Sequence, residues 1–151
     1  ALTLDPGTEA RRLAAPALLD KGRVLARRGA IKEAMAVFTD AQASDPNLAN
    51  AWNFACWFGS LGGFAADVMA ACERAVALEP DSGLIRDSRG LARALAGDYP
   101  GAIQDFQRFV EWGTKNRRYE EMIRQRQDWV RSLQANQNPF NNELLELLWD
   151  Q

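Results

Sequence analysis

The chain has 151 residues, of which 47% are hydrophobic and 25% are charged, as in an ordinary globular protein of one domain. Its net charge of −2 gives no sign of a nucleic-acid surface, and no run approaches the ~18 apolar residues of a membrane span. Histidine is absent, which removes the commonest general base and the commonest transition-metal ligand. We therefore expect no enzyme, no metal or other cofactor, and neither nucleic acid nor a membrane as a partner.

The N-terminal stretch reads as a lead-in to the first helix. Residues 1–7 are expected to be extended, and Thr8 is a candidate cap for a short helical turn over residues 9–13. Pro16 then either begins or kinks a helix that runs to about Arg28.

Three pairs of helices are expected to follow one another, each pair joined by a tight turn. The pairs are expected at 16–28 with 31–44, at 48–61 with 64–78, and at 82–96 with 99–112. Asp98 is a candidate N-cap for the last of these helices, and Pro100 is tolerated in its first turn.

The three pairs repeat one residue pattern at a period of about 34 residues. Columns of small, turn-forming and packing residues recur at this period: Gly22, Cys56 and Gly90; Gly29, Gly63 and Gly97; Ala34, Val68 and Ala102; Phe38, Cys72 and Phe106; Ala41, Ala75 and Phe109. The small residues let the two helices of a pair lie close together, and the turn glycines can adopt a positive φ. One such pair cannot bury its own apolar face, so the pairs must stack.

This pattern, most clearly in residues 87–109, resembles the tetratricopeptide repeat (TPR) family over residues 15–113, about two thirds of the chain. The resemblance implies an all-α, right-handed α-solenoid in a single domain over 1–151, with repeats at about 15–48, 49–82 and 83–113. It also implies a non-enzymatic scaffold that binds a peptide or partner protein in a concave groove. The second and third repeats are similar to modules attached to large multidomain bacterial proteins, and the missing initiator Met is consistent with a fragment of one.

After Gly113 the repeat columns stop, but helical periodicity continues. A helix at about 117–135 has one apolar and one polar face, as a capping element requires. Asn141 or Asn142 can cap a final helix at about 142–149, which is too short to be stable unless it docks on something. Its apolar residues suggest an alternative function as a self-association module, through Leu144, Leu145, Leu148 and Trp149.

Two smaller features bear on the cellular setting and on binding. Cys56 and Cys72 fall on repeat columns rather than at metal-binding spacing, so we expect reduced, structural thiols. With no apolar leader segment in residues 1–20, a cytoplasmic location is expected. Arg86 and Arg89 either pack their stems between helices, with heads reaching solvent or a carbonyl, or form an anion site for a partner's carboxylate.

The resemblance places the first helix of each pair on the concave side, where residues three or four apart share a face. The candidate partner-binding residues are Arg23, Asn50, Asn53, Trp57, Asp87 and Leu91. Trp57 is predicted to be the central anchor of this groove, because Trp often dominates interfaces; alternatively, Phe54 or a neighbouring helix covers it. Some family members hold C-terminal carboxylates with Lys and Asn at such positions, but here only the asparagines match, so that clamp is not expected.

Overall fold

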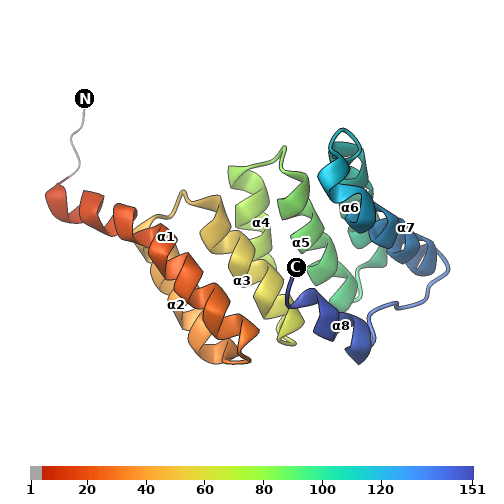
Figure 1. Ribbon diagram of the computed structural model, residues 1–151, viewed down its shortest axis with the longest axis horizontal. Coiled ribbons are helices and arrows are strands. Elements are labelled where there is room, and N and C mark those ends of the chain that lie inside the picture. The colour runs from red at the N-terminus through yellow and green to blue at the C-terminus, as the bar shows by residue number, and fades with distance from the viewer. Residues whose placement is uncertain (1–4) are drawn as a thin grey trace.

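The computed structural model describes residues 5–151, and helices dominate this part of the chain (Figure 1). Three helix pairs stack in chain order: α1 (Pro6–Arg27) with α2 (Ile31–Ser44), α3 (Ala49–Leu61) with α4 (Met69–Leu78), and α5 (Gly83–Leu95) with α6 (Tyr99–Gly113). A short 3-10 turn, η1 (Arg117–Tyr119), then leads to α7 (Glu120–Gln134) and α8 (Asn142–Leu148). The predicted all-α stack of three helix pairs with two further helices is thus confirmed.

The first helix begins earlier than the sequence suggested. Asp5, not Thr8, is its N-cap: Asp5 Oδ1 accepts from the N–H groups of Gly7 and Thr8 at 2.9 and 3.1 Å. Pro6 occupies the first position, where its missing N–H costs nothing. Pro16 therefore lies inside one continuous helix and does not begin it. Of the expected extended lead-in, residues 1–4 lie outside the described part of the chain.

The residues of the repeat columns play the structural roles that were predicted from their types. The three turn glycines all have positive φ, with values of 83°, 91° and 90° at Gly29, Gly63 and Gly97. Within the first pair, a Cβ on Gly22 would lie 2.4 Å from the fully buried ring of Phe38. The column that holds Gly22 therefore faces the column that holds Phe38 across each helix pair.

One helix of the middle pair starts later than expected. Residues 65–68 form a turn, and α4 begins only at Met69 rather than at 64. Val68, the large residue in a column otherwise held by alanine, packs beside Gly59, where a Cβ would lie 2.5 Å from Val68 Cγ1. The second repeat departs from the other two at this point.

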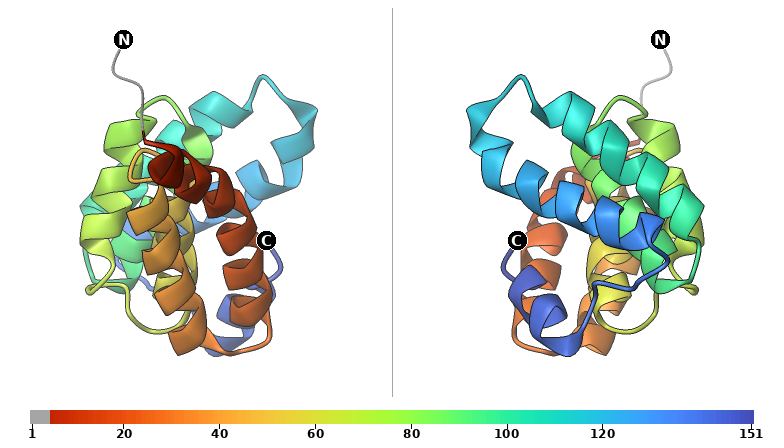
Figure 2. Two further views of the ribbon diagram at one scale, coloured as in Figure 1. Left: turned by 90° about the vertical axis from the view of Figure 1, so that its left-hand side faces the viewer. Right: turned by 90° about the vertical axis from the view of Figure 1, so that its right-hand side faces the viewer.

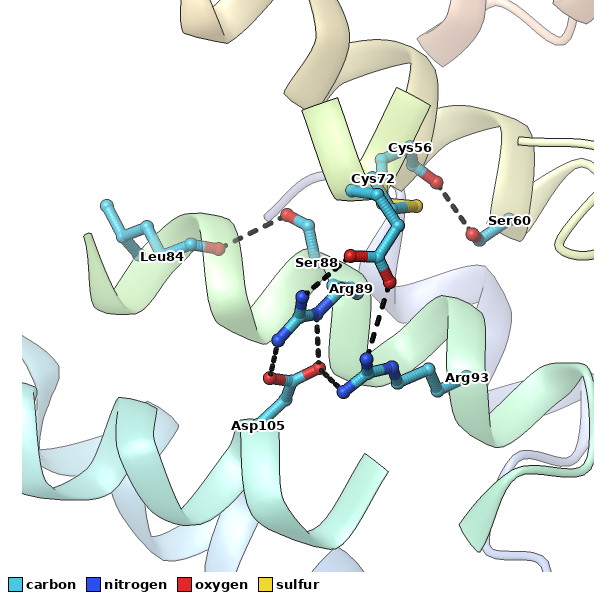
Figure 3. The surroundings of a disulfide bond; sticks show 9 residues. Cys56, Ser60, Cys72, Leu84, Ser88, Arg89, Arg93 and Asp105 are labelled. Carbon is cyan, nitrogen blue, oxygen red and sulfur yellow. Dashed lines mark hydrogen bonds and ion pairs between the residues drawn. A yellow bond between two sulfur atoms is a disulfide. The ribbon is translucent and has the colours of Figure 1, made fainter. Parts of the chain in front are cut away.

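Cys56 of α3 and Cys72 of α4 form a disulfide, which corrects the expectation of reduced thiols (Figure 3). Their Cα atoms are 4.9 Å apart, within the range that a disulfide spans, and both residues are only 1% exposed. The cause is the repeat itself: these two cysteines occupy the same facing columns as Gly22 and Phe38.

The last part of the chain extends the core beyond the third pair. Phe106 of α6 contacts Trp129 of α7 edge-on, with ring centroids 5.3 Å apart, and Trp129 in turn contacts Phe140 at 4.9 Å. Asn141 caps α8 by accepting from the N–H of Leu144 at 2.8 Å, which settles the choice between the two asparagines. Within residues 5–151, none of the helices combines the length and the apolar character that crossing a membrane requires.

Candidate partner-binding groove

The first helices of the three pairs, together with α7 and the C-terminal residue, enclose one pocket, called the groove pocket below. Its lining consists of Arg23 and Arg27 of α1; Asn53, Phe54, Trp57 and Phe58 of α3; Leu84, Asp87 and Ser88 of α5; Met122 and Arg126 of α7; and Gln151. Its cavity volume is about 170 Å³. Sites for whole small molecules are typically about 300–1,000 Å³, so the groove pocket is sized for single side chains of a larger ligand.

Trp57 lies at the wall of the groove pocket, yet it is only 8% exposed. Its ring belongs to the same apolar cluster as Phe58 and Leu91, so it also stiffens the stack of helices. Its indole Nε1 has no hydrogen-bond partner among the described residues. The structure thus combines the two alternatives from the sequence: Trp57 borders the groove pocket and is largely covered. Its role as a binding anchor stays a prediction.

Two more buried polar atoms at this wall lack partners within residues 5–151, namely Arg23 Nε and Asn53 Oδ1. The Arg23 guanidinium lies over the ring of Phe54, 5.6 Å from its centroid, which holds the charged head at the pocket. Buried polar groups are normally hydrogen-bonded, and an unpaired one costs free energy. Two donors and one acceptor at one pocket are therefore groups that a ligand could satisfy.

Asp87 also lines the groove pocket, but its charge is already balanced. Arg126 Nε and Nη2 donate to the two carboxylate oxygens of Asp87 at 2.8 and 2.7 Å. Arg126 is fully buried, and its guanidinium lies 4.4 Å from the ring centroid of Trp129. Arg126 was not among the residues predicted from the sequence, although its place in the apolar stripe of α7, between Ile123 and Trp129, was a usable signal.

The remaining two candidates do not join this site. Leu91 is fully buried in the core, so the structure corrects its expected position beside the groove. Asn50 is exposed on α3, outside the lining of the groove pocket. The structure brings together Arg23, Asn53, Trp57 and Asp87.

The C-terminal helix packs against its own chain (Figure 2), and Gln151, three residues after the end of this helix, lines the groove pocket. Leu148 is fully buried, and the ring of Trp149 stacks on Phe58 with centroids 6.1 Å apart. Arg27 Nε donates to the backbone carbonyl of Trp149 at 3.3 Å, and Arg126 Nη1 donates to the side chain of Gln151 at 3.1 Å. The prediction that this helix must dock is confirmed, and its docking place is a finding of the structure.

A second charged cluster lies away from the groove pocket, beside the disulfide (Figure 3). Arg89 donates to both oxygens of Asp105 at 2.8 Å and to Glu73 at 3.0 Å, and Arg93 bridges the same two carboxylates. Hydrogen bonding to Asp105 raises the pKa of Arg89 above its usual value. Arg86 donates to the carbonyl of Pro80 at 2.9 Å, and its guanidinium also lies 4.0 Å from Asp105. Arg89 thus ties α4, α5 and α6 together, and a partner's carboxylate is not needed to explain either arginine.

No group of three or more Cys, Asp or Glu side chains in the described part of the chain is arranged to hold a metal ion. The groove pocket offers apolar surface, three guanidinium groups, of which that of Arg126 is paired with Asp87, and unpaired hydrogen-bonding atoms. Such a set can bind and orient a ligand.

No protein-family model matches the chain, and no curated protein matches it in sequence. Solved structures do match. The first TPR domain of human RPAP3 superimposes with a TM-score of 0.67 at 22% identity, over 80% of this chain and 95% of that one. The first TPR of Spaghetti (RPAP3), bound to the HSP90 peptide SRMEEVD, matches with the same TM-score and identity, over 80% and 96% of the two chains. The chain therefore has the fold of a tetratricopeptide repeat domain.

Proposed function

We propose that this domain is a non-enzymatic interaction scaffold that binds a peptide or partner protein in the concave groove lined by α1, α3 and α5. The observation that carries the proposal is the set of three unpaired polar atoms, Arg23 Nε, Asn53 Oδ1 and Trp57 Nε1, at one pocket. A bound chain can supply the missing donors and acceptors from its backbone and side chains. The apolar rings around these atoms exclude water, which strengthens each hydrogen bond that forms.

A domain of similar fold supports a peptide as the ligand, since the first TPR of Spaghetti (RPAP3) is bound to the HSP90 peptide SRMEEVD. The proposal for this chain does not extend to that acidic tail. Arg23 and Arg27 add positive charge to the groove pocket, but Asp87 is committed to Arg126 and the clamp lysines are missing.

The test uses two asparagines on the same helix. Peptides are selected from a displayed library against the full chain, and their affinity is measured for Asn53→Ala and for Asn50→Ala. We expect Asn53→Ala to weaken binding about fivefold, the effect of one hydrogen bond of ~1 kcal/mol. Asn50→Ala is the matched control, because Asn50 is exposed outside the pocket, and it should change nothing. Selected peptides that bind Asn53→Ala as tightly as the unmodified chain would contradict the proposal.

The parent protein and the cellular location are also part of the proposal. The similarity of the second and third repeats to modules of large bacterial proteins supports a place in such a protein. The cytoplasmic location stays a prediction, and the buried Cys56–Cys72 disulfide favours an oxidising compartment over it. The gene sequence on either side of this segment tests both points.

A further inference from the structure

We propose that α8 is a displaceable occupant of the groove, and that the partner which replaces it presents an amphipathic helix of the same chemistry. This inference rests on the proposed function, because it takes the groove as the binding surface. It adds the kind of partner and a means of regulation: the chain's own C-terminal helix occupies part of the site until a partner helix that binds more tightly displaces it.

The contacts of the C-terminal segment are with residues of the groove pocket itself. Trp149 stacks on Phe58, Arg27 holds the carbonyl of Trp149, and Gln151 accepts from Arg126. All three of these partners line the groove pocket. A ligand in the groove and α8 therefore compete for the same side chains.

The segment presents the features of a helix bound in a groove. Leu144, Leu145, Leu148 and Trp149 are spaced to share one helix face, and all four contact the apolar core. On the same helix Leu147 is 64% exposed, and Glu143 and Glu146 face solvent. An apolar face laid into an apolar groove, with charges outside, is a recurring mode of peptide recognition.

Two properties make this occupant displaceable. With seven residues, α8 is too short to be stable by itself, so it persists only while it is docked. Of its four anchoring residues only Leu148 is fully buried. Phe140, packed against Trp129 just before α8, provides a separate anchor that keeps a released helix tethered near the groove.

The fit of α8 is incomplete, and this is what a partner can exploit. With α8 docked, Arg23 Nε, Trp57 Nε1 and Asn53 Oδ1 are still without hydrogen-bond partners among the described residues. A partner helix with the same leucine and tryptophan spacing, plus a carboxylate or amide side chain that reaches these atoms, makes hydrogen bonds that α8 does not. These additional hydrogen bonds allow the partner helix to replace α8 in the groove.

The test measures binding of a fluorescent synthetic peptide, residues 141–151, to three forms of the full chain by anisotropy. Leu148→Asp places a charge at the fully buried anchor and should release α8. We expect this variant to bind the peptide roughly tenfold or more tightly than the unmodified chain, because a tethered helix competes at high effective concentration. Leu147→Asp, the exposed neighbour on the same helix, is the matched control and should behave as the unmodified chain. Equal binding to all three forms overturns the proposal.

A second measurement needs no substitution and so does not depend on the variant folding. In native-state hydrogen exchange, the amides of α8 should open at a lower free energy than those of α7, while α7 stays protected. Exchange of α8 only together with α7 would show that α8 leaves only on unfolding, and would overturn the proposal.

Library-selected peptides distinguish a failure of the displacement proposal from a failure of the proposed groove function. Peptides that depend on Asn53 and prefer the Leu148→Asp form support both proposals. Asn53-dependent peptides that bind all three forms equally overturn displacement while the groove function stands. Failure of every peptide to depend on Asn53, in any form, overturns the groove function and the displacement proposal with it.

Discussion

Arg126 shows how much a single side chain joins in this molecule. It pairs with Asp87 of α5 through two hydrogen bonds, lies against Trp129 on its own helix, and reaches Gln151 near the C-terminus. Because Arg126 is fully buried, its charge depends on Asp87 for compensation. The pair therefore fixes both the wall of the groove pocket and the position of α7.

Removing Asp87 is expected to be costly, since an uncompensated buried charge remains. Asp87→Ala should lower the free energy of unfolding by about 3 to 5 kcal/mol, measured by urea denaturation. Asp128→Ala is the control, because Asp128 pairs with Arg131 in the open and such pairs contribute little. A similar loss for both variants would contradict the structural role given to the buried pair.

The disulfide gives a second test at this scale. Protein purified without reductant should carry no thiol that alkylates after denaturation, because Cys56 and Cys72 are joined. The Cys56→Ala, Cys72→Ala double variant should lose about 3 kcal/mol of stability, the value for closing a loop of similar length, while keeping its helical signal. Two alkylatable thiols, or an unchanged melting temperature, would restore the original expectation of free cysteines.

Part of the site could be predicted from single residues, and part could not. The period placed Arg23, Asn53, Trp57 and Asp87 on one face, and the structure brings them together. The disulfide could also have been predicted, because Cys56 and Cys72 fall on two repeat columns that face each other across a helix pair. The burial of Leu91 and the Asp87–Arg126 pair could not be predicted from single residues. Both depend on which helices pack against α5, and Asp87 and Arg126 are 39 residues apart in the sequence.

At the scale of helices, local signals predicted the elements well and their ends less well. The 34-residue period and the turn glycines predicted the three helix pairs correctly. The start of α1 was predicted too late, because Asp5 caps the helix and Thr8 does not. The place where α8 docks could not be predicted, because it depends on contacts such as that of Arg27 with Trp149, which are 122 residues apart. No local pattern reports such a contact.

The close approach of α1 and α2 can be tested at Gly22. In an exposed helix, Gly→Ala stabilises by up to about 1 kcal/mol. Here the new methyl group would overlap the ring of Phe38, which is fully buried and has no room to move. Overpacking of this kind costs about 1 to 3 kcal/mol, so Gly22→Ala should lower stability in urea denaturation. Lys21→Ala, at the exposed neighbouring position, is the control; a gain in stability at Gly22 would mean that the helices are not closely packed there.

For the whole molecule, docking of α8 on its own chain bears on self-association. The four residues that could join two molecules already contact the core of one, and Leu148 is fully buried there. We therefore expect sedimentation equilibrium to show a monomer over a wide range of concentration. A concentration-dependent dimer that Leu148→Asp abolishes would favour exchange of α8 between molecules instead.

The central claim is that a partner binds in the groove and displaces α8, and the five tryptophans report on it directly. The measurement is a ¹⁵N–¹H spectrum of the full chain, with assigned indole resonances, during titration with a library-selected peptide. The indole N–H of Trp57 should shift because it gains a hydrogen bond, and that of Trp149 should shift as it leaves Phe58. The indoles of Trp52, which donates to Pro46, and of Trp112, which packs against Gly83, should not shift, because neither residue lines the groove pocket. Shifts at Trp52 or Trp112 with Trp57 and Trp149 unchanged would contradict the account.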